Sequence, residues 1–269
     1  MSKPTTIDID AIVRSRMGSR ARWLPRFVTR WLEGYIHQDY INAFLKKGLV
    51  GVPFCEGVIE QLSVHLTVEG LEHLAADARP MTFVSNHPLG AIDGVTLGAI
   101  VGRHYDGRVK YLVNDLLMNL EGLAPLCVPV NKLGAQSRSL PQQVDAAFRS
   151  DNHIIMFPAG LCSRRTGGQI RDIPWRKAFI KKSIETRRDI VPVHFIAQNS
   201  DRFYRIAAWQ QRLGIKFNIA MTLLPDEMYR SRGQHYTVRF GRPIPCSTFD
   251  TSRPLHDWAQ WVQDQVYAL

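Results

Sequence analysis

Short apolar runs rich in β-branched residues alternate, from residue 64 onward, with stretches in which apolar residues recur every three or four positions. The first pattern is typical of buried strands and the second of amphipathic helices. We expect strands at residues 64–68, 81–85, 109–113, 126–130, 154–157, 190–195 and 217–224, and helices at residues 94–103, 141–149, 175–186, 205–213 and 255–266. This order predicts an α/β fold in which a mostly parallel mixed sheet is flanked by helices.

Residues 14–35 have a different pattern, in which arginines are interspersed with apolar residues at the spacing of an amphipathic helix. We expect this helix to begin near Pro25, because proline is favoured in a first turn. The helix can lie on an anionic membrane with its aromatic side chains in the interface, or it can pack on the protein's own core. We therefore expect a basic amphipathic helical region at residues 1–60 and one α/β domain at residues 61–269.

The chain has 34 basic and 24 acidic residues, which gives a formal net charge of +10. Such a surface attracts anionic partners, which include nucleic acids, acidic lipid headgroups and phosphorylated cosubstrates. Because the sequence lacks zinc-finger, RRM and helix-turn-helix signatures, we expect a membrane surface and no nucleic acid. Four scattered cysteines, the absence of a secretory signal and apolar runs well short of roughly 20 residues favour a peripheral protein of the reducing cytosol.

The sharpest local feature is the segment S-N-H-P-L-G-A-I-D-G, residues 85–94, which directly follows an expected strand. Ligands of open α/β sheets bind at the carboxyl ends of strands, where helix N-termini present free N–H groups. A histidine held by a carboxylate can accept the proton of a hydroxyl that attacks a carbonyl group. His87 and Asp93 are therefore candidate catalytic residues, although an isolated pair also fits a structural turn.

Two later segments repeat the arrangement of a strand that ends in polar residues, and a third supplies a further strand. Residues 125–132 end in Asn-Lys, residues 156–165 read M-F-P-A-G-L-C-S-R-R, and residues 189–195 contain Pro192. Backbone N–H groups and arginines of the second of these segments can hold a phosphate or a carboxylate. Pro192 indicates an edge strand or a bulge.

The four segments together resemble the blocks of the glycerophospholipid acyltransferase superfamily, which are N-H-x4-D, a strand ending in a basic residue, F-P-E-G-[TS]-R-S and [VI]-[VI]-P-[VI]. The resemblance covers roughly residues 64–195. It implies an acyltransferase domain at residues 61–269, His87 and Asp93 as the catalytic pair, no metal and no bound cofactor, with acyl carrier protein or coenzyme A thioester as the acyl donor. The substrate-binding residues that it implies are Asn86, Lys132, Phe157, Pro158, Ala159, Gly160, Ser163, Arg164 and Arg165.

Two departures from the superfamily concern the acceptor. Five residues separate His87 from Asp93 instead of four, and Ala159 replaces the acidic residue that the family links to glycerol phosphate. The combination N-H-P-L-G-x-[IL]-D-G with F-P-A-G-L-x-S-R resembles a bacterial, hemolysin-like subgroup that includes O-acyltransferases of lyso-aminolipids. The resemblance implies a lyso-ornithine or lyso-glycine lipid as acceptor, at the cytoplasmic face of the inner membrane. The alternatives are acylation of 1-acylglycerol-3-phosphate and hydrolysis of the acyl thioester.

A charged run follows the third block and is open to two interpretations. Its residues either line the same cleft as His87 or form the solvated start of the next helix. The residues in question are Arg171, Asp172, Trp175, Arg176 and Lys177.

Overall fold

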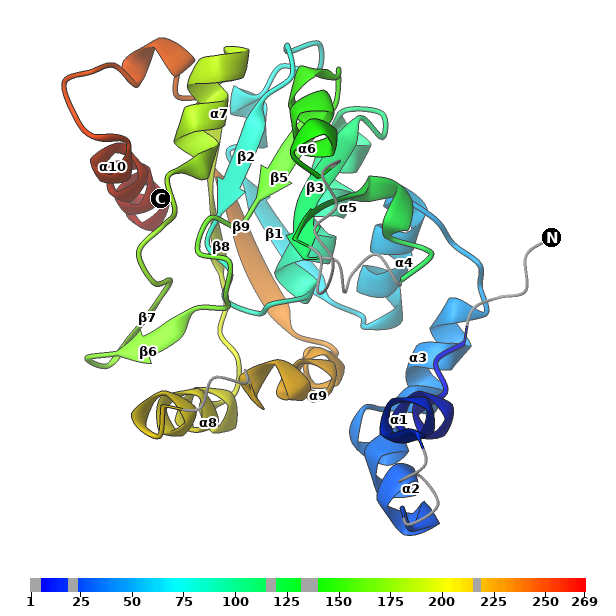
Figure 1. Ribbon diagram of the computed structural model, residues 1–269. Helices are drawn as coiled ribbons and strands as arrows, with labels where there is room; N and C mark the ends of the chain where they lie inside the picture. The colour runs from blue at the N-terminus through cyan, green and yellow to red at the C-terminus, as the bar shows by residue number, and fades with distance from the viewer. Residues whose placement is uncertain (1–5, 19–23, 115–119, 132–139, 215–218) are drawn as a thin grey trace.

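The computed structural model describes residues 6–18, 24–114, 120–131, 140–214 and 219–269. Its centre is a seven-stranded sheet of order β1-β9-β8-β2-β5-β3-β4 (Figure 1). The strands are β1 (His65–Glu69), β2 (Thr82–Ser85), β3 (Val109–Asn114), β4 (Cys127–Asn131), β5 (His153–Met156), β8 (Ile190–Ile196) and β9 (His235–Phe240). Neighbouring strands are parallel except β8 and β9, which confirms the predicted α/β fold with a mostly parallel mixed sheet.

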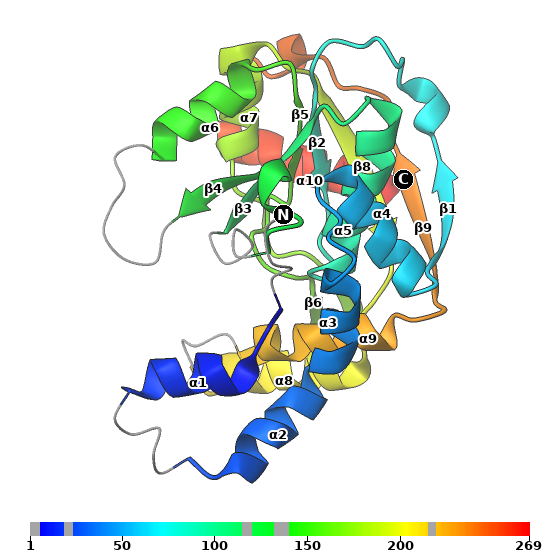
Figure 2. The same cartoon turned by 90° about the vertical axis from the view of Figure 1, so that its right-hand side faces the viewer.

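Helices cover both faces of this sheet (Figures 1 and 2). One face carries α4 (Val52–Gln61) and α5 (Ile92–His104), and the other carries α6 (Leu140–Arg149), α7 (Ala178–Thr186) and α10 (Leu255–Ala268). Successive residues of a strand point to opposite faces. Accordingly, Phe83 of β2 packs in the core under α4 and α5, whereas Val84 packs in the core under α7 and α10. The continuous apolar runs in the sequence reflect this burial on both sides.

A further group of helices lies beyond the end of the sheet at which β8 leads into α8, at the bottom of Figures 1 and 2. It consists of α1 (Ile9–Met17), α2 (Arg26–Tyr35), α3 (Gln38–Leu45), α8 (Asp201–Arg212) and α9 (Leu224–Arg230). Pro25 lies just before α2, and its fixed φ is compatible with the start of a helix. The predicted start of this helix near Pro25 is therefore confirmed. Within the described ranges, no helix is both long enough and apolar enough to cross a membrane.

The strand predicted at residues 217–224 is wrong for the part that the structure describes. Residues Ile219–Leu223 form a 3-10 helix, η5, which leads into α9. Leu223 and Leu224 pack against Phe203 and Tyr204 of α8, so the end of this apolar run packs between helices and does not pair with the sheet. The neighbouring sheet position belongs to β9, whose residues alternate between the core and the surface.

Pro192 lies in the interior of the sheet, because β8 is flanked by β9 and β2. In the antiparallel pairing of β8, Val193 lies opposite Phe240 and Ile190 lies opposite Ile244. Residues 190–193 of β8 therefore lie opposite residues 240–244, so the partner segment has one extra residue. This extra residue is a bulge, the second of the two arrangements that a strand proline indicates. The Pro192 carbonyl accepts a hydrogen bond from the Gly241 N–H at 2.8 Å. Proline has no N–H to donate, and the bulge is where the regular pairing that would need this N–H is interrupted.

Candidate active site

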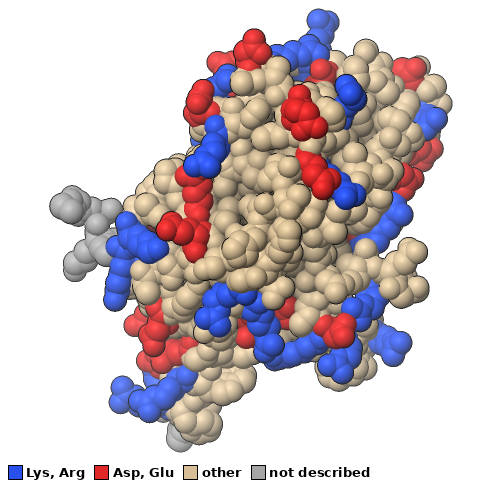
Figure 3. Space-filling view, turned by 180° about the vertical axis from the view of Figure 1, so that it is seen from behind, with Lys and Arg blue, Asp and Glu red and all other residues tan. Residues whose placement is uncertain are grey.

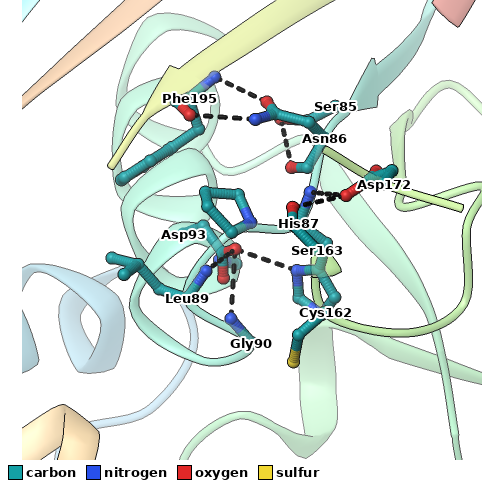
Figure 4. Close-up of polar contacts among 12 residues, drawn as sticks. Ser85, Asn86, His87, Leu89, Gly90, Asp93, Cys162, Ser163, Asp172 and Phe195 are labelled. Atoms are coloured by element: carbon teal, nitrogen blue, oxygen red, sulfur yellow. Dashed lines mark hydrogen bonds and ion pairs between the residues drawn. The ribbon is translucent and has the colours of Figure 1, made fainter. Parts of the chain in front are cut away.

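His87 and Asp93 meet at the carboxyl end of β2. His87 lies in the loop that follows the strand, and Asp93 is in the first turn of α5. The His87 Nδ1 atom is 3.0 Å from Asp93 Oδ2 (Figure 4). Because β5 and β8 are parallel to β2, the segments that follow these three strands gather at the same edge of the sheet.

The Asp93 carboxylate is fully buried at the start of α5 and is surrounded by backbone donors. Its Oδ2 atom accepts hydrogen bonds from the N–H groups of Leu89 at 3.0 Å and Gly90 at 3.2 Å, and its Oδ1 atom accepts from Gly94 at 2.9 Å. Burial acts to raise the pKa of Asp93, but the charge of His87 and these hydrogen bonds outweigh burial and lower the pKa. The group is therefore an ionised carboxylate at neutral pH.

The His87 ring is held on two sides and remains accessible on a third. It stacks on Phe157 with ring centroids 4.1 Å apart, and its side chain keeps 17% of its surface exposed. Burial acts to lower the pKa of His87, but the Asp93 charge and hydrogen bond outweigh burial, so the pKa is raised. No described residue hydrogen-bonds to Nε2. With the Nδ1 proton donated to Asp93, Nε2 is an unprotonated atom that can accept a proton.

Gly90 lies in the loop between His87 and Asp93, which is one residue longer than in the superfamily, and it allows this loop to turn so that the two side chains meet. Its φ of +80° lies in the left-handed region that glycine adopts without strain. A Cβ atom at this position would lie 2.4 Å from the Sγ atom of Cys162, so a larger residue would displace the third block from the turn. Figure 4 shows Cys162 beside this turn.

The third block holds the backbone of the catalytic histidine. The Ser163 N–H donates to the His87 carbonyl at 2.8 Å, and the Ser163 hydroxyl donates to Asp172 at 2.6 Å. The Asp172 carboxylate also accepts from the His87 N–H at 3.2 Å and from Trp175 Nε1 at 2.9 Å. Asp172 thus joins the first block to the third.

Asp172 was not among the site residues that the family resemblance implied. Asp172 and Trp175 are both buried and α7 begins only at Ala178, so a solvated helix start is wrong for these two residues. Burial raises the pKa of Asp172, although the hydrogen bonds from Ser163 and Trp175 act to lower it.

Several residues expected to bind substrate are used inside the protein. The Asn86 amide donates to the Phe195 carbonyl at 2.9 Å and accepts from the Phe195 N–H at 2.7 Å, which ties the His87 loop to β8 (Figure 4). Ala159 is fully buried in the core under α7 and α10, and Pro158 is buried as well. Gly160 is exposed, and its φ of +69° forms the turn.

The basic residues of the third block face α8. Arg164 donates to the Cys162 carbonyl at 2.7 Å and lies over the Phe203 ring at 5.8 Å. Arg165 pairs with Asp201 at 2.7 Å and lies over the Tyr204 ring. Lys132 lies outside the described residues, so its role stays a prediction. The described residues include no group of three or more His, Cys, Asp or Glu side chains that is placed to hold a metal ion.

Known proteins similar to this chain are acyltransferases. A family described as Acyltransferase matches residues 11–269. A lyso-glycine lipid O-acyltransferase of Phocaeicola vulgatus is 55% identical over 265 residues, which cover 98% of this chain and 95% of the relative. A protein of the same name from Bacteroides thetaiotaomicron is 54% identical over 265 residues, with 98% and 97% covered.

The fold is also found in a solved structure. The 1-acyl-sn-glycerophosphate acyltransferase PlsC of Thermotoga maritima superposes with a TM-score of 0.52 at 15% identity, over 96% of this chain and 86% of the other. At this identity the likeness shows the fold alone. The family match and the two close relatives show more: this chain belongs to the acyltransferase family and is an acyltransferase.

Proposed function

We propose that this acyltransferase transfers a fatty acyl chain from a thioester donor to the free hydroxyl of a lyso-glycine lipid, with His87 as general base. The observation that carries the proposal is the His87–Asp93 contact of 3.0 Å at an accessible strand end, in a chain that is 55% identical to a lyso-glycine lipid O-acyltransferase. The donor is the thioester of acyl carrier protein or of coenzyme A. We propose lysophosphatidic acid only as the weaker acceptor.

The reaction needs one proton acceptor and no covalent acyl-enzyme. The acceptor hydroxyl gives its proton to His87 Nε2 while its oxygen attacks the thioester carbonyl, and the ionised Asp93 stabilises the imidazolium that forms. The tetrahedral intermediate then expels the thiolate, so a C–O ester bond replaces the C–S bond. The proton on Nε2 leaves with the thiol, and His87 returns to its neutral form.

The residues of the third block bear on the acceptor headgroup. Ala159 is buried and has no polar side chain, so this position contributes no carboxylate for a glycerol hydroxyl. Arg164 is next to Ser163, whose N–H donates a hydrogen bond to the His87 carbonyl. The guanidinium of Arg164 can bind a carboxylate or a phosphate. We propose that Arg164, with Lys132, binds the carboxylate of the glycine headgroup.

A lipid acceptor requires contact with a membrane, and α2 supplies a suitable surface. Phe27 is 74% exposed and Trp31 is 64% exposed, so these two aromatic side chains do not pack on the protein's own core. Arg26 and Arg30 are exposed on the same helix. Exposed aromatic residues beside arginines favour the interfacial interpretation of this helix. We propose peripheral binding to the cytoplasmic face of the inner membrane.

Parallel assays of the purified chain test the acceptor. Lyso-glycine lipid, lysophosphatidic acid and no acceptor are each combined with acyl carrier protein and coenzyme A thioesters, and the products are identified by mass spectrometry. We expect the highest kcat/KM with lyso-glycine lipid. A higher kcat/KM with lysophosphatidic acid would contradict the proposed acceptor, and thioester consumption that is equal with and without lipid would indicate a hydrolase.

A further inference from the structure

Helix α8 has one face that packs on the protein and an opposite face that packs on nothing in the described structure. Phe203, Tyr204 and Ala207 are buried. Arg205, Trp209 and Arg212 follow one another at four- and three-residue spacing, which places them along the other side of the helix. Trp209 is 58% exposed, and Leu213 beyond the helix end is 55% exposed.

The charge of this outer face is positive and is not neutralised by its surroundings. The acidic residue of α8, Asp201, is paired with Arg165. Among the described residues, neither Arg205 nor Arg212 forms an ion pair. A tryptophan between unpaired arginines is the composition of a surface that contacts anionic lipid, because the ring inserts at headgroup level while the guanidinium groups bind phosphates.

The outer face of α8 is continuous with the aromatic residues of α2. Trp31 stacks on Tyr35 with centroids 5.5 Å apart, and the Arg202 guanidinium lies 5.6 Å from the centroid of the same Tyr35 ring. The Asp226 carboxylate of α9 joins the two regions, since it contacts His37 at 3.0 Å and Arg202 at 3.4 Å. The exposed aromatic residues of the two helices therefore belong to one fixed surface.

This surface lies on the same side of the molecule as the catalytic residues. β8 ends at Ile196 and leads into α8, and β2 is parallel to β8, so His87 is at the edge of the sheet that faces α8. Figures 1 and 2 show α2, α8 and α9 at one end of the molecule, and Figure 3 shows Lys and Arg side chains gathered toward that end on the rear face. A bilayer that touches both helices would lie in front of the active-site edge.

We infer that the outer face of α8, formed by Arg205, Trp209, Arg212 and Leu213, is a second membrane-contact site that binds anionic lipid headgroups. The inference rests on the proposed membrane acceptor. It extends that proposal from the N-terminal helix α2 to a second element, α8, which begins 166 residues after α2 ends. Two contact sites prevent the protein from pivoting about α2 and keep the His87 edge directed at the lipid.

Sedimentation of the full chain with vesicles tests the second site. Vesicles of phosphatidylcholine with phosphatidylglycerol are compared with vesicles of phosphatidylcholine alone, for the parent and for Trp209→Ser and Arg205→Glu/Arg212→Glu. Because each basic residue near an anionic surface changes partitioning by roughly fivefold, the double charge variant should bind the anionic vesicles at least about tenfold more weakly. Trp209→Ser should weaken binding by several-fold.

Matched controls lie on the far side of the molecule. Arg149→Glu at the end of α6 reverses one exposed charge, and Ile184→Ser on α7 replaces one exposed apolar side chain by serine, so both should leave vesicle binding unchanged. Acyl transfer to detergent-dispersed acceptor should be the same in all these variants, so failure of the second site is distinguishable from failure of the proposed reaction. Binding of anionic vesicles by both α8 variants at the level of the parent would overturn the inference. It would also be overturned if the parent did not bind anionic vesicles, or if the α8 variants lost self-association while their vesicle binding was unchanged.

Discussion

The active-site edge and the helical surface below it are constructed in opposite ways. At the edge, buried polar groups hold His87 from several directions: Asp93 binds its ring, while Ser163 and Asp172 bind its backbone. On the surface, Phe27, Trp31 and Trp209 are more than half exposed. The first arrangement fixes the position of His87, as catalysis by a general base requires. The second leaves apolar side chains exposed for contact with a lipid bilayer. Substitutions in the two regions should therefore affect different measurements.

The largest effect on turnover is expected from His87→Ala. Loss of a positioned general base lowers kcat by roughly 10²–10⁴-fold. Vesicle binding and the thermal midpoint should stay close to those of the parent, because the backbone bonds of residue 87 remain. Single-turnover kinetics with acyl carrier thioester measures the first effect, and near-parental turnover in a folded variant would remove His87 from the mechanism.

Asp93→Asn should lower kcat less than the loss of His87, and it should also move the pH profile. Activity requires neutral His87, so kcat/KM rises with pH through the pKa of this residue. Asp93 raises that pKa against the opposing effect of burial, so the acid limb of the parent lies above the usual imidazole value of about 6.5. Without the carboxylate charge, burial dominates and the limb moves to lower pH. An unchanged limb would show that the pairing is not functional.

Asp172→Asn is expected to affect stability first and rate second. Both carboxylate oxygens accept hydrogen bonds, so an amide leaves at least one buried donor of Ser163, Trp175 or the His87 backbone without an acceptor. The cost is about 1–3 kcal/mol in the free energy of unfolding. Chemical denaturation measures it, with Asp264→Asn as the control, because Asp264 is an exposed surface partner of Arg171. Equal losses in the two variants would deny Asp172 a structural role.

The smallest effect on the folded protein is expected from Trp31→Ser. The side chain is 64% exposed, so the thermal midpoint should shift little, whereas partitioning to anionic vesicles should weaken by several-fold. The measurement is co-sedimentation at low and high salt beside a thermal melt. A lower midpoint with unchanged vesicle binding would mean that α2 packs on the protein and does not contact lipid.

The sequence predicted those features that local pattern determines. The central strands were recognisable because they are short, continuously apolar and followed by turns, and the His87–Asp93 pair followed from its position after β2. Residues 217–224 were misassigned because an apolar run that packs on another helix resembles a buried strand. The role of Asp172 does not follow from local pattern, because the contact that brings it to the site is a hydrogen bond from the His87 N–H, 85 residues earlier in the chain.

The hydrogen bond between the Asp172 N–H and the Tyr267 oxygen of α10, at 2.8 Å, has a consequence for protein synthesis. Asp172 positions the His87 backbone, and Asp172 is itself positioned from a helix 95 residues further along the chain. A nascent chain therefore has every residue of the four blocks outside the ribosome well before α10 has been translated. Such a chain lacks the hydrogen bond from Asp172 to Tyr267, so the contacts around the His87 backbone are complete only after α10 has docked.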